Sequence, residues 1–185
     1  MPQERTPERE DSLLADEQKT IPWTVARERM ANREPGQANW LATVRPDGRP
    51  HLMPLIAVWI DGAFHFLAGE GTRKARNLEA DSNCVISMSS FELPSLDIVV
   101  EGQCEPLGDA DAVRDAADVF KANGWPLEAR GVEVFGPNAP TAGPPPYRIF
   151  RMVPSKAFGL PGQYGMEQFD PGDLPKPTRW TFGDD

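Results

Sequence analysis

Three basic side chains stand where a short helix is predicted to begin. They are Arg73, Lys74 and Arg76, in the segment Gly71-Thr72-Arg73-Lys74-Ala75-Arg76-Asn77-Leu78. A helix N-terminus carries positive partial charge and unpaired N–H groups, so each cation there is unfavourable by roughly a few tenths of a kcal/mol. A phosphate would accept hydrogen bonds from those N–H groups and from the basic side chains. The segment predicts a small phosphorylated ligand, and the alternative is a capped surface helix with solvated cations.

Other residue types that often carry chemistry are scarce in the chain. The two histidines, His51 and His65, are not spaced like metal ligands, because a two-residue hairpin turn would pair His65 with Val58 and leave His51 several residues further along. We therefore expect no metal site. The two cysteines, Cys84 and Cys104, form no C-x-x-C pair. They are interpreted as small buried apolar residues rather than as a disulfide or active thiols.

Composition excludes several classes of partner. The chain has 185 residues, enough for one domain with a sizeable core, and 28 acidic residues against 19 basic ones give a net charge of -9. This balance argues against nucleic acid as a partner. No apolar run approaches the length of a membrane span, and the charged N-terminus lacks the apolar core of a signal peptide. We expect a cytoplasmic protein with no membrane contact.

The elements that must position the basic segment are strands joined by Asp-Gly turns. Strands are predicted over residues 40–44, 51–59 and 64–68, and Asp61-Gly62 is a strong signal for a two-residue hairpin. The central strand has apolar residues of both parities, so both of its faces must be covered, as in a barrel wrapped by helices or a partner subunit. Pro54 cannot donate to a sheet ladder, so this strand is expected to border a gap where a flat heteroaromatic ligand could bind.

The rest of the chain completes a single antiparallel barrel rather than a doubly wound α/β sheet. Antiparallel hairpins dominate the pattern, and we find no internal repeat and no second domain. Three regions are predicted: residues 1–20 as a flexible tail, 21–157 as the barrel domain, and 158–185 as an arm or lid. Helices are predicted from Thr20 to about Pro35, over 72–80 and from Asp109 to Gly124, strands over 83–89, 96–107 and 147–153, and a loop over 136–146.

Three motifs together resemble a known family. They are Trp40-Leu41-Ala42-Thr43-Val44, Asp47-Gly48-Arg49-Pro50-His51 and the helix-start segment already described. With them, residues 20–155 resemble the pyridoxamine 5′-phosphate oxidase-like split β-barrel superfamily. Within it the chain is most similar to the group B flavin and deazaflavin oxidoreductases, many of which use coenzyme F420. The resemblance implies a mainly β fold with flanking helices, a six- to seven-stranded antiparallel split barrel of the FMN-binding type.

The resemblance also implies where a cofactor would lie. The flavin or deazaflavin ring would lie along the strand after His51, the phosphate would meet the helix-start side chains, and two residues of the next strand would lie near the connecting chain. His51 either ends the strand at the barrel mouth or contacts cofactor or substrate. The candidate cofactor-binding residues are His51, Leu52, Met53, Pro54, Leu55, Leu67, Ala68, Thr72, Arg73, Lys74 and Asn77.

The function implied by the resemblance is redox chemistry. We expect an oxidoreductase that uses coenzyme F420 or FMN to transfer hydride to or from a small unsaturated or conjugated substrate, as a homodimer with cofactor sites at the subunit interface. Catalytic residues are not assigned. In the true oxidase the flavin strand carries an arginine and a lysine, whereas residues 52–57 here are wholly apolar, which disfavours strict oxidase activity. The alternatives are an FMN-dependent pyridoxamine-phosphate-oxidase-like enzyme, a non-catalytic flavin or haem binding protein, and a purely structural barrel.

Overall fold

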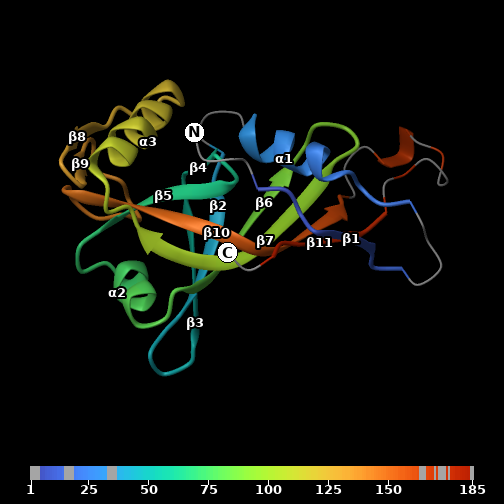
Figure 1. Ribbon diagram of the computed structural model, residues 1–185, viewed down its shortest axis with the longest axis horizontal. Helices are drawn as coiled ribbons and strands as arrows, with labels where there is room; N and C mark the ends of the chain where they lie inside the picture. Colours follow the sequence, from blue (N-terminus) through green and yellow to red (C-terminus); the bar gives the residue numbers. More distant parts are fainter. Residues whose placement is uncertain are drawn as a thin grey trace.

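The computed structural model describes residues 5–14, 19–32, 37–162, 166–168, 170, 174 and 176–183. The described chain is mainly antiparallel β-sheet with flanking helices, as predicted (Figure 1). In chain order the elements are β1 (Arg9–Ser12), α1 (Trp23–Ala31), β2 (Asn39–Val44), β3 (Pro50–Leu55), β4 (Ala57–Ile60), β5 (Ala63–Gly69), α2 (Arg73–Ala80), β6 (Asn83–Ser90), β7 (Leu96–Pro106), α3 (Ala110–Ala122), β8 (Glu128–Arg130), β9 (Glu133–Phe135), β10 (Tyr147–Pro161), the 3-10 helix η1 (Met166–Gln168) and β11 (Thr178–Thr181).

A bent strand closes the barrel. The ladder runs β3-β2-β6-β7-β10, and β10 pairs on its other side with β5, which pairs with β4. β3 and β4 are separated only by Ile56, so one strand leaves β2 at this residue and joins β5. The single central strand predicted over residues 51–59 is therefore two shorter strands. Because β3 pairs only with β2 in the described chain, its other edge is open, in agreement with the gap predicted from Pro54.

The predicted turns have the expected backbone. Asp61 and Gly62 have φ angles of 47° and 75°, the left-handed conformation that a two-residue turn needs, and His65 pairs with Val58 as predicted. The turn before β3 is closed by Gly48, with a φ of 81°, whose N–H donates to the Arg45 carbonyl at 2.8 Å. These two turns place β3 and β4 in register with their neighbours.

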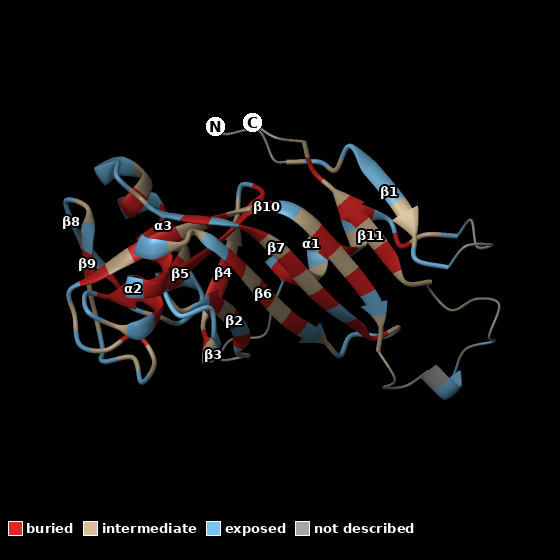
Figure 2. Ribbon diagram, turned by 90° about the horizontal axis from the view of Figure 1, so that it is seen from below, coloured by how far each residue is buried: buried red, intermediate tan, exposed pale blue. Residues whose placement is uncertain are grey.

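Two apolar clusters cover the two faces of β5, whose residues are all buried. Phe64, Phe66 and Ala68 belong to the cluster inside the barrel, which α1 closes, whereas Leu67 belongs to the cluster under α3. On α1 the predicted stripe of Trp23, Ala26 and Met30 is buried. On α3 the predicted stripe is also confirmed, with Asp109 as N-cap and Val113, Ala116, Ala117 and Phe120 buried. α2 and α3 lie toward the same end of the molecule (Figures 1 and 2).

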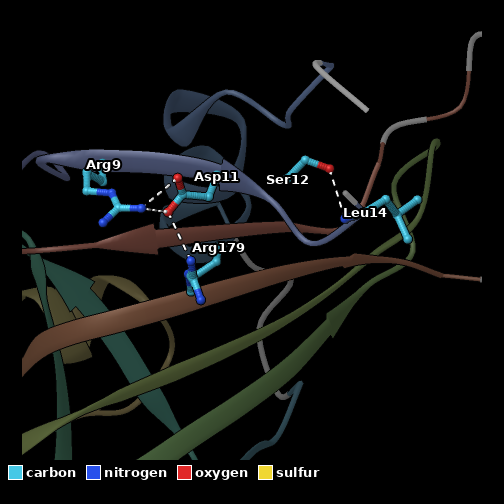
Figure 3. A network of polar contacts seen from close by, with 5 residues as sticks. All are labelled: Arg9, Asp11, Ser12, Leu14 and Arg179. Carbon is cyan, nitrogen blue, oxygen red and sulfur yellow. Dashed lines mark hydrogen bonds and ion pairs between the residues drawn. The ribbon is translucent and has the colours of Figure 1, made fainter. Parts of the chain in front are cut away.

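The far end of the sheet joins both ends of the chain and corrects the tail prediction. Arg9–Ser12 form β1, which pairs with β11, so the prediction of a flexible tail is wrong for these residues. Figure 3 shows the Asp11 carboxylate between Arg9 and Arg179, with N–O distances of 3.0 and 3.1 Å. Local composition missed this strand because its partner lies far away in the sequence. Part of the predicted arm likewise extends β10 and forms β11.

Other boundaries differ from the predictions in smaller ways. Pro22 and not Thr20 is the N-cap of α1, and the Thr20 hydroxyl instead donates to the Glu10 carboxylate. The end predicted for this helix at Pro35-Gly36 lies outside the described residues. The short strands β8 and β9 were not predicted. In the described chain no helix is long and apolar enough to cross a membrane, and no group of three or more metal-ligating side chains occurs.

Candidate functional site

The helix-start cations of α2 point in different directions. Thr72 is the N-cap, and its hydroxyl accepts from the Ala75 N–H at 3.4 Å and donates to the Gly69 carbonyl at 2.9 Å. Arg73 and Arg76 are exposed, whereas Lys74 is 2% exposed. Sequence reasoning treated the cations as one group, but the helical rotation sends only Lys74 inward.

Lys74 is a buried ammonium without a carboxylate partner in the described chain. Its Nζ donates to the Thr141 carbonyl at 2.8 Å. An ammonium has three N–H donors, so this bond leaves hydrogen-bonding capacity for an anionic group. Burial lowers the pKa of Lys74 to about 8, because the charged form loses hydration without gaining a counter-charge. The protein thus holds a positive charge in a place that disfavours it.

The Thr141 carbonyl is positioned by residues 137–146, here called the strap. The Gly69 N–H donates to the Ala142 carbonyl at 2.8 Å, which fastens the strap to the end of β5. A Cβ at Gly69 would lie 2.5 Å from that carbonyl oxygen, so a side chain there would force the strap away. The Tyr147 hydroxyl is 2.9 Å from the carbonyl oxygens of both Pro137 and Gly143. The strap is therefore fixed at three points over α2.

A polar cluster extends from the helix into the barrel mouth. The Asn77 Nδ2 donates to Thr43 Oγ1 at 2.9 Å, and the same oxygen lies 3.4 Å from His51 Nδ1. Asn77 Oδ1 is buried and has no partner in the described chain, so an acceptor remains that a ligand hydroxyl or N–H would satisfy. Partial burial, and then the nearby Arg45, Arg73 and Lys74, lower the pKa of His51. His51 therefore lies within the field of the same cations.

An apolar cavity of about 260 Å³ adjoins this cluster. Its walls come from the kink between β3 and β4, from β5, from the end of α3 and from the strap. Thr141 belongs both to this cavity and to the Lys74 hydrogen bond, so it connects the apolar and cationic parts. The cavity is lined by Ala38, Pro54, Leu55, Ile56, Leu67, Phe120, Trp125, Ala139, Pro140, Thr141 and Ala142.

The structure brings together some of the predicted residues and separates others. Pro54, Leu55 and Leu67 share the cavity, Lys74 and Asn77 share the buried side of α2, and Thr72 is the N-cap of this helix. Leu52 is paired with Ala42 and is 56% exposed on the outer face of the sheet. Met53 lies on the opposite face of β3, since side chains alternate along a strand. Ala68 is buried inside the barrel, and Arg73 is exposed.

Sequence reasoning missed three parts of this site. Thr43, which connects His51 with Asn77, was read only as part of a strand. Thr141 lies in a segment predicted as a loop, and nothing local shows that the loop returns to α2. The terminal turn of α3 was interpreted as ordinary core packing, yet Phe120 and Trp125 form a cavity wall. For Trp125 a signal existed, because a large aromatic residue directly after the Gly124 stop has no place in the helical stripe.

A family model described as pyridoxamine 5′-phosphate oxidase matches residues 28–158 of this chain. The matched segment contains the barrel strands, the α2 cations and the strap. It ends within β10, before β11, so the pairing of the two chain ends lies outside it. No curated protein matches the chain at a significant level.

Solved structures with a similar fold include proteins named for three different cofactors. An F420 reductase is 22% identical, with a TM-score of 0.51 and coverage of 70% of this chain and 94% of its own. An FAD-binding protein from Mesorhizobium loti is 17% identical, with a TM-score of 0.52 and coverage of 92% and 96%. A heme binding protein from Mycobacterium smegmatis is 18% identical, with a TM-score of 0.52 and coverage of 78% and 56%. At these identities the similarity establishes the shared fold.

Proposed function

Because the chain belongs to the pyridoxamine 5′-phosphate oxidase family, we propose that it is an oxidoreductase that binds a flavin-type cofactor at the site around Lys74. The cofactor in this proposal is reduced coenzyme F420, and FMN is the close alternative. The substrate is a small unsaturated or conjugated molecule that exchanges hydride with the cofactor. When bound, the cofactor ring supplies the hydride chemistry, so few acidic or basic residues are required of the protein.

The observation that supports the proposal best is the uncompensated ammonium of Lys74 beside an apolar cavity. Burying a charge without a partner of opposite sign costs on the order of several kcal/mol. A phosphate from a ligand would supply that partner and would raise the pKa of Lys74 again. A flat ring would occupy the neighbouring cavity and contact its apolar walls at Pro54, Leu55 and Leu67. The donors and the walls fit a ligand that is apolar at one end and anionic at the other.

The protein residues have distinct tasks in this proposal. Lys74 and the N-terminal N–H groups of α2 hold the phosphate, and Arg73 adds charge at its exposed side. Asn77 is oriented by Thr43 and offers its free Oδ1 to the chain that leads to the ring. The strap and the end of α3 exclude water from the cavity. Orientation and water exclusion are what a protein contributes when its cofactor carries the reaction.

The proposal includes a homodimer with the cofactor sites at the subunit interface. The outer face of β2 and β3 supports it, because Trp40, Val44 and Leu52 are 47%, 38% and 56% exposed on neighbouring positions. Apolar residues of both parities in the central strand predicted that both faces would be covered. β4 meets that expectation within one chain, whereas the outer face of β3 lacks a cover among the described residues. A second copy of the chain would provide it.

Purification followed by analysis of the released ligand tests the cofactor assignment. We expect the absorption spectrum and mass of a deazaflavin, or tight binding of added F420 in a fluorescence titration. Release of FMN with no detectable F420 binding would replace the first choice by its alternative. Binding of neither cofactor would refute the enzyme proposal and favour a structural barrel.

A double variant tests the phosphate assignment. Changing Arg73 and Lys74 together to Ala removes two charge-assisted contacts, each worth about 1.5 kcal/mol, so cofactor affinity should fall about 100-fold. The matched control changes Arg114 and Lys121 to Ala, which removes two exposed cations from α3. Equal cofactor affinities for the wild type and the Arg73/Lys74 variant would refute the assignment of the phosphate to the start of α2.

A binding protein without turnover is the second candidate. The described cavity walls are mostly apolar, and none of the residues that line the cavity is titratable. Binding a cofactor without turnover requires no titratable group in the cavity. Stopped-flow mixing of the reduced cofactor complex with a panel of conjugated acceptors separates the two functions, since a binding protein would show no oxidation faster than free cofactor.

A further inference from the structure

Cys84 and Cys104 form a close pair of thiols inside the barrel. Cys84 on β6 pairs with Gly102 on β7, and Cys104 lies two residues beyond Gly102, so both thiols point to the same face of the sheet. Their sulfur atoms are 2.9 Å apart, and each residue is 5% exposed. A disulfide bond has an S–S length of about 2.05 Å, so a sub-ångström approach would join them. The expectation that both are buried is confirmed, but their contact was not foreseen.

A solvent-filled cavity lies on the other face of β7 from this pair. Cys104 lines this cavity of about 600 Å³, which opens between the ends of β6 and β7 and the middle of β10. Most other lining residues are polar, and Asn83 and Gln103, which directly precede Cys84 and Cys104, point to the opposite face of the sheet from the thiols. A peroxide molecule in this cavity is separated from the Cys104 thiol by β7 itself, so it reaches the pair through local opening of the sheet and not through unfolding of the whole barrel. Cys84 faces Thr43 across the β2–β6 ladder.

We propose that Cys84 and Cys104 are a redox pair that a hydroperoxide converts reversibly into an intrachain disulfide. In the first step one sulfur attacks the peroxide, an S–O bond forms, the O–O bond breaks and one water leaves after proton transfer. In the second step the other thiol attacks this sulfenic acid, an S–S bond forms, the S–O bond breaks and a second water leaves. Two thiols and one hydrogen peroxide thus give one disulfide and two waters. A dithiol reductant returns the pair to the thiol form.

The environment sets a slow and pH-dependent reaction. The hydrogen bond to the Cys84 sulfur, and then burial, raise the pKa of Cys104. The thiolate is the reactive form, so oxidation at neutral pH should be slower than for the same thiols in the unfolded chain, and it should accelerate as pH rises. The pair would remain reduced under ordinary conditions and respond to sustained oxidant.

Mass spectrometry of the folded full-length chain after treatment with hydrogen peroxide tests the proposal. The intact mass should fall by two hydrogen atoms, titratable thiols should fall from two to none, and dithiothreitol should restore both values. Cleavage after Glu92 and Glu101, which lie between the two cysteines, should yield fragments joined only in the oxidised sample. Two free thiols in the folded chain after prolonged treatment with excess peroxide at elevated pH, where the thiolate is more populated, would overturn the proposal. A product with added oxygen or a disulfide between chains would do the same.

A single variant and a stability measurement complete the test. Cys84→Ser should lose the two-hydrogen mass change and instead accumulate oxygen on Cys104. The oxidised wild type should unfold at a higher temperature than the reduced one, because the bond closes a loop and restricts the unfolded chain. Both readouts are independent of any flavin, so they stand or fall separately from the proposed enzyme activity.

Discussion

Lys74 combines a structural cost with a proposed function. Its pKa of about 8 lies below the ordinary value of 10.5, so between these two pH values the unfolded chain binds a proton that the folded chain has released. The free energy of unfolding should therefore rise with pH from 8 to 10.5, by about 3 kcal/mol at most. Below pH 8 both forms are charged, and this contribution is flat.

Urea unfolding of the wild type and of Lys74→Met at several pH values between 7 and 10.5 measures this effect. Methionine keeps much of the side-chain volume without the charge, so its curve should lack the additional rise. Comparison of the two curves cancels the titration of groups shared by both proteins. Parallel curves would show that Lys74 is hydrated rather than buried in solution.

His65 provides the opposite pH window. Burial, with a smaller effect from the nearby Arg151, lowers the pKa of His65 from 6.5 to about 4. Below pH 6.5 the His65 imidazole binds a proton in the unfolded chain, whereas in the folded chain it stays neutral down to about pH 4. Stability should therefore fall as pH decreases through this window, by about 3 kcal/mol at most. His65→Leu should be less sensitive over the same range in urea unfolding, and an unchanged pH dependence would contradict the buried neutral imidazole.

At the scale of elements, the strap is the part of the site that most depends on distant contacts. The Tyr147 hydroxyl lies within hydrogen-bonding distance of two strap carbonyls and accepts from the Ala139 N–H at 3.2 Å. Tyr147→Phe removes these part-buried hydrogen bonds, which should lower the free energy of unfolding by about 0.5–1.5 kcal/mol. It should also expose the Lys74 ammonium, since Thr141 belongs to the same strap.

Two measurements separate these effects. Chemical denaturation gives the loss of stability, and the rate of Lys74 acetylation, followed by peptide mass mapping, reports its exposure. Gly69→Ala is the matched second variant, because its Cβ would press on the Ala142 carbonyl and displace the strap while the Tyr147 hydroxyl is kept. Faster acetylation in both variants is expected. If Lys74 reacts at the wild-type rate in both, the strap does not cover it.

The sequence predicted the elements that local patterns define and missed those that distant pairing defines. Asp61-Gly62, the Asp109 cap and the α3 stripe are local signals, and each is found as predicted. β1 pairs with a strand more than a hundred residues away, and the extension of β10 pairs with β7 and β11, so no short window contains these strands together with their partners. The candidate site divides in the same way. Lys74 was identified from charge at a helix start, whereas Thr141 requires knowledge of where the strap returns.

The sequence also did not predict which side chains of the central strand face the core and which face outward. The pattern of residues 51–59 was read as a strand covered on both faces, and this holds for β4 but not for β3 within one chain. The difference arises at Ile56, where the strand changes neighbours. A periodicity argument assigns alternation along a strand but does not locate the residue at which the strand leaves one sheet edge for another.

At the scale of the whole molecule, the outer face of β2 and β3 exposes apolar side chains to water, which is energetically unfavourable. Contiguous exposed apolar patches often mark interaction surfaces. If a second copy covers the face, Leu52→Glu places a charge in the centre of that contact and should convert a dimer into a monomer. Leu14→Glu is the matched control, because Leu14 is 45% exposed just after β1 (Figure 3), and β1 is at the opposite end of the strand order from β3.

Sedimentation equilibrium over a range of protein concentrations measures the change. Wild type and Leu14→Glu should sediment as dimers, and Leu52→Glu as a monomer with an unchanged circular dichroism spectrum. Because the proposal puts the cofactor site at the interface, cofactor should tighten the wild-type dimer by mass action, and the monomeric variant should bind cofactor weakly although Lys74 is intact. A monomeric wild type would refute the dimer. A monomeric variant with full cofactor affinity would instead confine the cofactor site to one chain.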